Sequence, residues 1–284
     1  MQTQSLNVRS AASTSDIKGI DANEYPPMPA PDLANGVTFK AGELKEMIQQ
    51  VAFAASTDEA RPVLQGVMVS LRDGELTLAA TDGFRISVRR APLAASLAKP
   101  LEMIVPARAL TELARIAADP EAEIRLHIPS GRGQAIFRLK DAELVTQLIE
   151  GNFPDYRAII PRALKTHTIL TTAALLAACK QAEIIAREGN NVIRVDVRGR
   201  GQEPGVVEIS AQSEETGNSE VQLDANIDGP DLTIAFNVRY LREVLDVIKT
   251  PSVALETIAH NAPAVVRPVG DENFVHVIMP MHLG

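Results

Sequence analysis

Four segments of this 284-residue chain share one apolar register at nearly the same interval. Their first leucines, Leu44, Leu110, Leu175 and Leu241, lie 66, 65 and 66 residues apart. In each segment apolar side chains recur at i, i+3, i+4 and i+7, the spacing that places them on one face of an α-helix. The sixteen positions are Leu44, Met47, Ile48, Val51, Leu110, Leu113, Ala114, Ala117, Leu175, Ala178, Cys179, Ala182, Leu241, Val244, Leu245 and Ile248. This period predicts a repeated unit of about 65 residues with one amphipathic helix in each copy.

The segments between the helices have the composition of strands and tight turns. Helices are expected over 40–56, 106–118, 172–188 and 237–249, with Thr171 or Thr172 capping the third and Asn237 capping the fourth. The strands expected most clearly are Val63–Leu71, Glu75–Ala80, Phe84–Arg90, 253–258, 264–269 and 273–279. The Asp73-Gly74 pair is typical of a hairpin turn, and Ala211–Ser219, which is rich in Ser and Glu, is predicted to be a mobile loop.

The length of the chain suits two domains with two repeat units each. We expect an α+β fold with similar domains over 35–162 and 163–284, each with two helices packed on antiparallel sheets. Residues 1–34 differ in composition and hold no complete unit. They are expected to form a short strand near Leu6–Ser10 and an extended linker, because four prolines occur between Pro26 and Pro31.

The residues give little sign of covalent chemistry, and no cofactor or metal is expected. Cys179 is the single cysteine and occupies an apolar helix position, so it is interpreted as an inert core thiol. The five histidines show no metal-ligand spacing. The glycines of Gly199–Gly205 precede a strand and not a helix, which indicates a hairpin turn and not a dinucleotide loop. No apolar run is long enough to span a membrane and no signal sequence precedes the first helix, so a cytoplasmic location is expected.

Charge is distributed unevenly along the chain. The formal net charge is −8, yet the four expected helices together carry +2, so the rest carries −10. If the helices lie on one side of the molecule, only that side is suited to meet phosphates. On charge alone, the alternative that these lysines and arginines form solvated helix faces is preferred.

Four short motifs then resemble the bacterial DNA polymerase III beta subunit, the sliding clamp family. They are Ala80–Ile86, Phe153–Arg157, Phe236–Leu241 and Val277–Met281, and they occur in the family's order inside a repeat of two helices per domain. The resemblance covers about 35–284. It implies the DNA clamp fold, with 35–162 as the central clamp domain, 163–284 as the C-terminal one, and 1–34 as a C-terminal remnant of a first domain that is otherwise missing.

The resemblance also implies partners and a mechanical role. Family members form a homodimeric ring whose helices surround double-stranded DNA without reading its sequence. Closure of that ring uses the first domain, of which this chain is expected to hold only the remnant over 1–34. The implied DNA contacts are Arg108 and Arg115 first, and then Lys40, Lys45, Arg239 and Arg242.

A cleft between the two domains is the second site that the resemblance implies. In the family it binds short linear motifs of the polymerase III catalytic subunit, the clamp loader and other repair polymerases. Methionines in such a surface suit several partners, because their side chains are pliable. The implied lining consists of Leu64, Thr81, Gly83, Phe84, Arg85, Ile86, Pro154, Ile159, Tyr240, Val277, Met279, Pro280 and Met281.

The function expected is therefore that of a sliding clamp, a non-catalytic processivity subunit that tethers the replicative polymerase to DNA. One alternative is a truncated clamp that binds partner peptides without closing a ring. A remote alternative is a hydrolase that uses Asp82 and Asp155.

Overall fold

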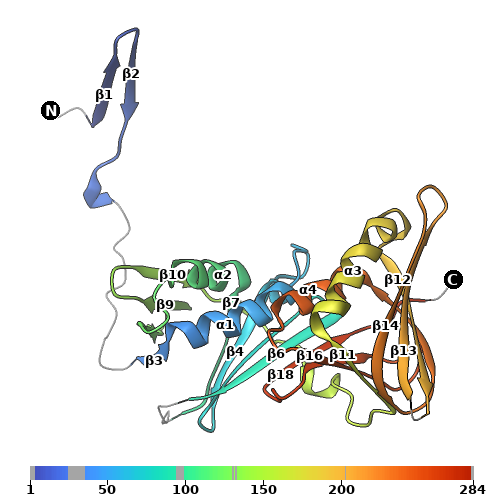
Figure 1. Cartoon of the computed structure of the whole chain (residues 1–284). Helices are drawn as coiled ribbons and strands as arrows, with labels where there is room; N and C mark the ends of the chain where they lie inside the picture. The colour runs from blue at the N-terminus through green and yellow to red at the C-terminus, as the bar shows by residue number, and fades with distance from the viewer. Residues whose placement is uncertain are drawn as a thin grey trace.

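The computed structural model describes residues 4–24, 36–93, 99–129, 131, 133–201 and 203–282. Four α-helices in this part of the chain lie along one side of the molecule, and the long strands lie on the other (Figure 1). The helices are α1 (Ala41–Val51), α2 (Ala107–Ile116), α3 (Thr172–Ala186) and α4 (Val238–Val247). Helix α1 packs on α2, α3 packs on α4, and α1 also contacts α4 in the middle of the molecule.

One antiparallel sheet of twelve strands runs through most of the described chain. Its spatial order is β15 (Leu232–Asn237), β12 (Val192–Arg200), β13 (Glu203–Ser213), β14 (Gly217–Asp228), β11 (Thr166–Thr171), β16 (Ser252–Thr257), β17 (Ala264–Pro268), β18 (Phe274–Ile278), β6 (Arg85–Pro92), β5 (Glu75–Thr81), β4 (Gly66–Arg72) and β7 (Leu101–Pro106).

Two smaller sheets complete the described structure. A four-stranded sheet has the order β10 (Glu143–Gln147), β9 (Gln134–Arg138), β8 (Glu123–His127) and β3 (Val37–Lys40). A hairpin of β1 (Ser5–Ser10) and β2 (Ser13–Lys18) stands away from the body of the molecule (Figure 1).

The two halves of the long sheet meet where β18 pairs with β6. Phe274 lies opposite Arg89 and Ile278 opposite Arg85, so five residue pairs form the joint. Every residue of β18 is buried, which means that both faces of this strand are covered. A strand buried on both faces has a strongly specified register, because a slip of one residue exchanges its two faces.

The helix repeat forms the two main cores. All sixteen positions of the apolar register are buried, which confirms the predicted helix faces. The helices α1 and α2 cover one core, and α3 and α4 cover the other, while a third cluster around Met68 and Tyr156 lies beside the β6–β18 joint. Burial raises the pKa of the Cys179 thiol to about 12, as expected of a thiol that packs as a small apolar side chain.

Several local expectations are wrong or shifted. The predicted loop Ala211–Ser219 is shorter than expected: only 214–216 form a turn, between the end of β13 and the start of β14, because Ile209 and Ala211 are buried in the core and hold the strand there. Thr171 makes no side-chain capping bond, and the Thr172 hydroxyl donates to the Thr250 carbonyl oxygen instead.

Other elements follow the expectation closely. Asn237 caps α4, where its side-chain oxygen accepts from the Arg239 N–H. The strand expected from Val63 begins at Gly66, after a short 3-10 helix over Pro62–Gln65.

The prolines between Pro26 and Pro31 lie outside the described residues. Within the described chain, none of the helices has the length and apolar composition that a membrane crossing requires.

Candidate functional site

Ten of the thirteen residues expected to line a cleft surround one hollow of about 100 Å³, called here the apolar cavity. They come from the 3-10 helix before β4, from the β5–β6 turn, from the segment 154–159, and from β18 and the residue after it. Phe84, Ile159 and Met279 are exposed at its rim. The ten are Leu64, Thr81, Gly83, Phe84, Arg85, Ile86, Pro154, Ile159, Val277 and Met279.

The β5–β6 turn forms one wall of the apolar cavity and is held by its own side chains. The Asp82 Oδ1 atom accepts from the backbone N–H groups of Phe84 and Arg85, at 2.9 and 3.0 Å. The Thr81 hydroxyl accepts from the Gly83 N–H and donates to the Arg85 carbonyl oxygen. Gly83 has φ +95°, which an L side chain rarely adopts, so glycine is needed where the turn reverses. Asp82 and Gly83 therefore act together as turn residues.

The other three expected cleft residues, Tyr240, Pro280 and Met281, do not line this cavity. The Met279 N–H donates to the Phe84 carbonyl oxygen and so continues the joint, whereas the Met281 N–H donates to Ala235 of β15. Met281 and the intervening Pro280 therefore lead the chain away toward β15. Tyr240 lies on α4 and lines a neighbouring hollow.

That neighbouring hollow has a volume of about 520 Å³ and is called here the polar cavity. It shares Phe84 and Arg85 with the apolar cavity, so the two are adjacent. Phe53, Arg61 and Glu243 are among the lining residues that the sequence motifs did not reveal. Arg61 and Glu243 resemble ordinary surface charges in the sequence, and their positions follow from contacts across the fold that no local pattern reveals. Burial raises the pKa of the Tyr240 phenol there, and the Asp82 carboxylate adds to the shift.

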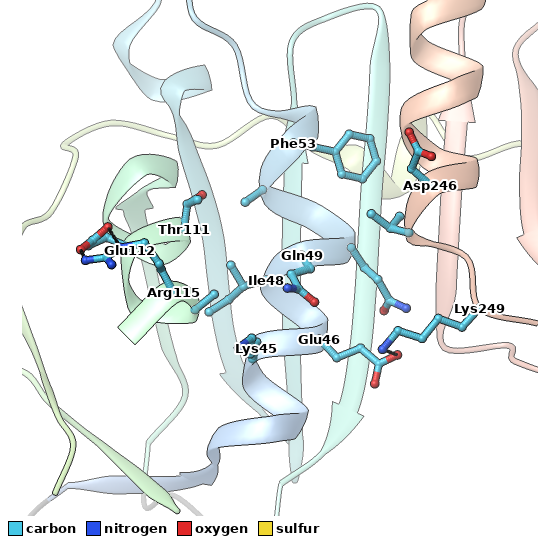
Figure 2. A pocket seen from close by; sticks show the side chains of 14 residues that line it. Lys45, Glu46, Ile48, Gln49, Phe53, Thr111, Glu112, Arg115, Asp246 and Lys249 are labelled. Atoms are coloured by element: carbon cyan, nitrogen blue, oxygen red, sulfur yellow. Dashed lines mark hydrogen bonds and ion pairs between the residues drawn. The ribbon is translucent and has the colours of Figure 1, made fainter. Parts of the chain in front are cut away.

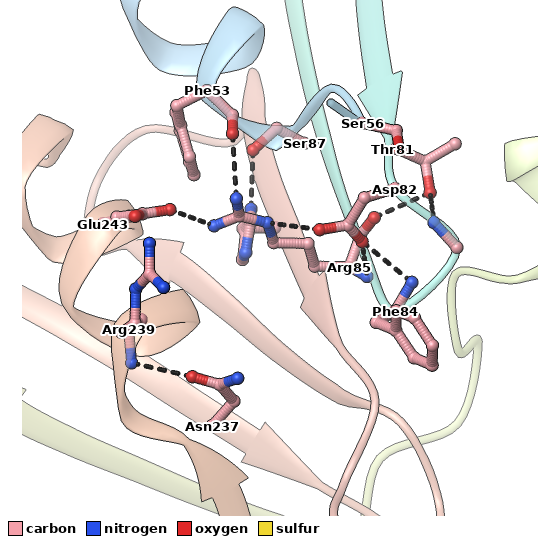
Figure 3. Close-up of polar contacts among 12 residues, drawn as sticks. Phe53, Ser56, Thr81, Asp82, Phe84, Arg85, Ser87, Asn237, Arg239 and Glu243 are labelled. Carbon is pink, nitrogen blue, oxygen red and sulfur yellow. Dashed lines mark hydrogen bonds and ion pairs between the residues drawn. The ribbon is translucent and has the colours of Figure 1, made fainter. Parts of the chain in front are cut away.

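Arg85 lines both cavities, and Figure 3 shows its polar contacts. Its side chain is only 8% exposed, and each of its three nitrogens donates to a protein acceptor. The acceptors are Asp82 Oδ2 at 3.1 Å, Glu243 Oε2 at 2.5 Å and the Phe53 carbonyl oxygen at 2.9 Å. The guanidinium carbon also lies 4.3 Å from the centre of the Tyr240 ring. Arg85 is therefore fully engaged by the protein itself.

His276 on β18 is completely buried behind this group. Its Nδ1 atom lies 2.6 Å from the Ser87 hydroxyl on β6, and its ring stacks on Phe53 at a centroid distance of 5.5 Å. Burial holds the pKa of His276 well below the ordinary value for histidine, and the charge of Arg85 lowers it further. The imidazole is therefore neutral in the folded chain near neutral pH.

We expect the free energy of unfolding to fall as the pH drops through about 6.5, because the unfolded chain then takes up a proton at His276 that the folded chain excludes. One such proton contributes at most about 1.4 kcal/mol per pH unit. The free energy of unfolding can be measured by urea unfolding at several pH values between about 7.5 and 5.5. Plotted against pH, it should have a shallower slope for His276→Gln than for the original chain. His260→Gln, at an exposed histidine, is the control, and an unchanged slope for His276→Gln would contradict this account.

A larger groove of about 820 Å³ lies on the helix side of the molecule, between α1, α2 and α4 (Figure 2). It is lined by apolar side chains such as Ile48 and Phe53 and by charged side chains of both signs. The cations among them already have partners within the protein. Lys249 pairs with Glu46 at 3.1 Å, Arg115 pairs with Glu112, and Lys45 donates to the Ala117 carbonyl oxygen.

The six expected DNA contacts therefore fall into two groups. Arg115, Lys45 and Arg242 have protein partners. The Arg115 hydrogen bond lowers the pKa of Glu112, and Arg242 pairs with Glu183 at 2.9 Å and Asp246 at 3.0 Å. The other three, Lys40, Arg108 and Arg239, are exposed and form no ion pair with a described residue.

The remote hydrolase alternative finds no support in these residues. Asp155, like Asp82, accepts a backbone N–H as a turn residue, in this case from Arg157. In the part of the chain that the structure describes, no three His, Cys, Asp or Glu side chains are placed to hold a metal ion. Both aspartates thus have structural roles.

The chain has two units that are joined strand to strand beside a small cavity. Each unit has a pair of helices on one side and antiparallel strands on the other, and this arrangement defines the DNA clamp fold. The chain belongs to the DNA polymerase III beta subunit family: a model of its central domain matches 38–155, and a model of its C-terminal domain matches 157–282. Its function is that of a DNA sliding clamp, and its homologues are non-catalytic processivity factors of DNA polymerase III.

Individual relatives agree with this assignment. The beta sliding clamp of Bacillus subtilis (strain 168) is 31% identical, in an alignment that covers 99% of this chain and 74% of the relative. The beta sliding clamp of Staphylococcus aureus (strain Mu50) is 32% identical over 99% of this chain and 72% of its own length. The crystal structure of the Bacillus subtilis DNA polymerase sliding clamp superposes with a TM-score of 0.89 at 30% identity, and covers 100% of this chain and 74% of that one.

Proposed function

We propose that the apolar cavity binds the apolar side chains of short linear peptides from the polymerase III catalytic subunit, the clamp loader and repair polymerases. The observation that carries the proposal is the convergence of four separate segments on one small apolar hollow whose rim exposes Phe84, Ile159 and Met279. Exposed large apolar side chains beside a hollow are typical of ligand sites. The substitution of Met279 treated in the Discussion tests this proposal.

We further propose that the helix side of the molecule faces duplex DNA and that Arg108 and Arg239 are its main phosphate contacts. Each lies two residues before the first leucine of its repeat, so the two occupy equivalent positions in the two domains. Both lie in the first turn of a helix, where the helix dipole disfavours a cation. An exposed arginine at an unfavourable position, repeated in both domains, favours a phosphate ligand over a purely structural role.

Replacing Arg108 and Arg239 together by alanine should weaken the binding of a short duplex at every sequence. Because each free cation that meets a phosphate releases about one counterion, the slope of log affinity against log salt should flatten by about 0.9 per residue removed. Fluorescence anisotropy of a labelled duplex across a KCl series measures the slope.

Two single variants provide the controls for this experiment. Arg115→Ala should flatten the slope less than Arg108→Ala, because Glu112 already neutralises Arg115. Arg72→Ala, at the end of β4, removes the same charge away from the helices and should leave the slope unchanged. A larger effect of Arg115→Ala than of Arg108→Ala contradicts the assignment.

The homodimeric ring, the cytoplasmic location and the identity of individual peptide partners stay predictions. So do the domain limits 35–162 and 163–284.

A further inference from the structure

The contacts of Arg85 link the apolar cavity to the helix α4, which belongs to the other half of the molecule. Asp82 lies in the β5–β6 turn and Arg85 begins β6, whereas Glu243 lies 158 residues after Arg85 along the chain. The Arg85 guanidinium lies between their two carboxylates, with distances of 3.1 and 2.5 Å (Figure 3). Its central carbon also lies over the Tyr240 ring. One buried cation thus joins a cavity wall to a distant helix.

A buried guanidinium requires this kind of partnership. Removing a charge from water is costly unless hydrogen bonds and opposite charges compensate, and a planar guanidinium is satisfied best by acceptors in fixed directions. Glu243 supplies the acceptor for Nη1, which no other described residue bonds. Without the Glu243 carboxylate, Arg85 loses one of its two charged partners, and we expect its side chain to turn toward solvent.

Such a movement affects the wall of the apolar cavity directly. The Asp82 carboxylate binds the Arg85 side chain through Oδ2 and the N–H groups of Phe84 and Arg85 through Oδ1. The same carboxylate therefore fixes both the guanidinium and the turn. The turn carries Gly83 and Phe84, which line the cavity, while Glu243 itself does not.

We propose that Glu243 is a positioning residue for peptide recognition, which acts through Arg85 to hold the β5–β6 turn in its binding conformation. The inference rests on the proposed function of the apolar cavity and adds to it a residue from α4. Peptide affinity accordingly depends on a carboxylate outside the cavity.

A matched control is available one turn further along α4. Asp246 carries the same charge and is paired with Arg242 at 3.0 Å and with Lys180 at 3.1 Å, yet it does not contact Arg85. Asp246→Asn therefore makes the same change of charge on the same helix without disturbing the β5–β6 turn.

The test is a double-mutant cycle on the affinity of a fluorescein-labelled clamp-binding peptide with two neighbouring large apolar side chains. Glu243→Gln should weaken binding about five- to tenfold, and Asp246→Asn less than about twofold. In an Arg85→Met background, Glu243→Gln should cause no further loss, because its effect requires the guanidinium. Hydrogen exchange at the Phe84 and Arg85 amides should be faster in Glu243→Gln than in the original chain.

Two results separate this proposal from the one on which it rests. If Met279→Asp abolishes binding while Glu243→Gln binds like the original chain, the positioning role is wrong and the cavity assignment stands. If the original chain does not bind the peptide, the cavity assignment fails first. Equal protection of the Phe84 and Arg85 amides in Glu243→Gln and the original chain also overturns the positioning role, independently of peptide affinity.

Discussion

Met279→Asp is expected to lower the affinity for a clamp-binding peptide by at least about 100-fold. Met279 is 39% exposed at the rim of the apolar cavity, so aspartate is hydrated in the free chain and the fold tolerates it. When an apolar peptide side chain enters the cavity, the carboxylate must lose that hydration without gaining a partner. This unfavourable desolvation lowers the affinity for the peptide. Fluorescence anisotropy with a labelled peptide measures the loss.

The matched control for this prediction is Val269→Asp. Val269 is 42% exposed, which is close to the value for Met279, but it follows β17 and does not line the cavity. The control should bind the peptide like the original chain, and both variants should unfold at similar temperatures. Peptide binding that survives Met279→Asp would show that the ligand is held elsewhere.

The second large effect is expected from Phe274→Ala, which should lower the free energy of unfolding by about 3–5 kcal/mol. Phe274 begins β18 and is fully buried in the core that α3 and α4 cover. Its removal leaves a void in a strand that also pairs with β6, so both halves of the molecule should lose stability. Urea unfolding followed by circular dichroism gives the value.

Phe84→Ala is the matched comparison for this second prediction. The same atoms are removed, but Phe84 is 58% exposed, so the change in the free energy of unfolding should stay within about 0.5 kcal/mol. Equal losses for the two variants would mean that β18 is not part of a packed core.

The sequence predicted the helices well because their apolar positions repeat with the period of the helix itself. The faces that begin at Leu44, Leu110, Leu175 and Leu241 are buried as expected. The error at Ala211–Ser219 has a physical reason: its Ser, Glu and Gly content is typical of loops, yet long strands also carry polar residues on their solvent face. Composition there obscured an alternation that continues through Val221 and Leu223.

The site was predictable where it lies in contiguous motifs and unpredictable where it depends on distant pairing. The motifs around Thr81–Ile86 and Val277–Met279 brought most of the cavity lining together. Glu243, in contrast, resembles any charged residue on an exposed helix face, and its partner Arg85 lies 158 residues away. The sequence likewise does not distinguish Arg115 from Arg108, because the ion pair between Arg115 and Glu112 is evident only in the structure.

The β6–β18 joint also has a geometric consequence. Because both faces of β18 are buried, a slip of one residue would exchange the valines at 275 and 277 with His276, so only one register is allowed. Neighbouring antiparallel strands keep a nearly constant twist, so a joint with one register fixes one angle between the two units. The angle between the two units is therefore a property of the single chain, determined before any partner binds.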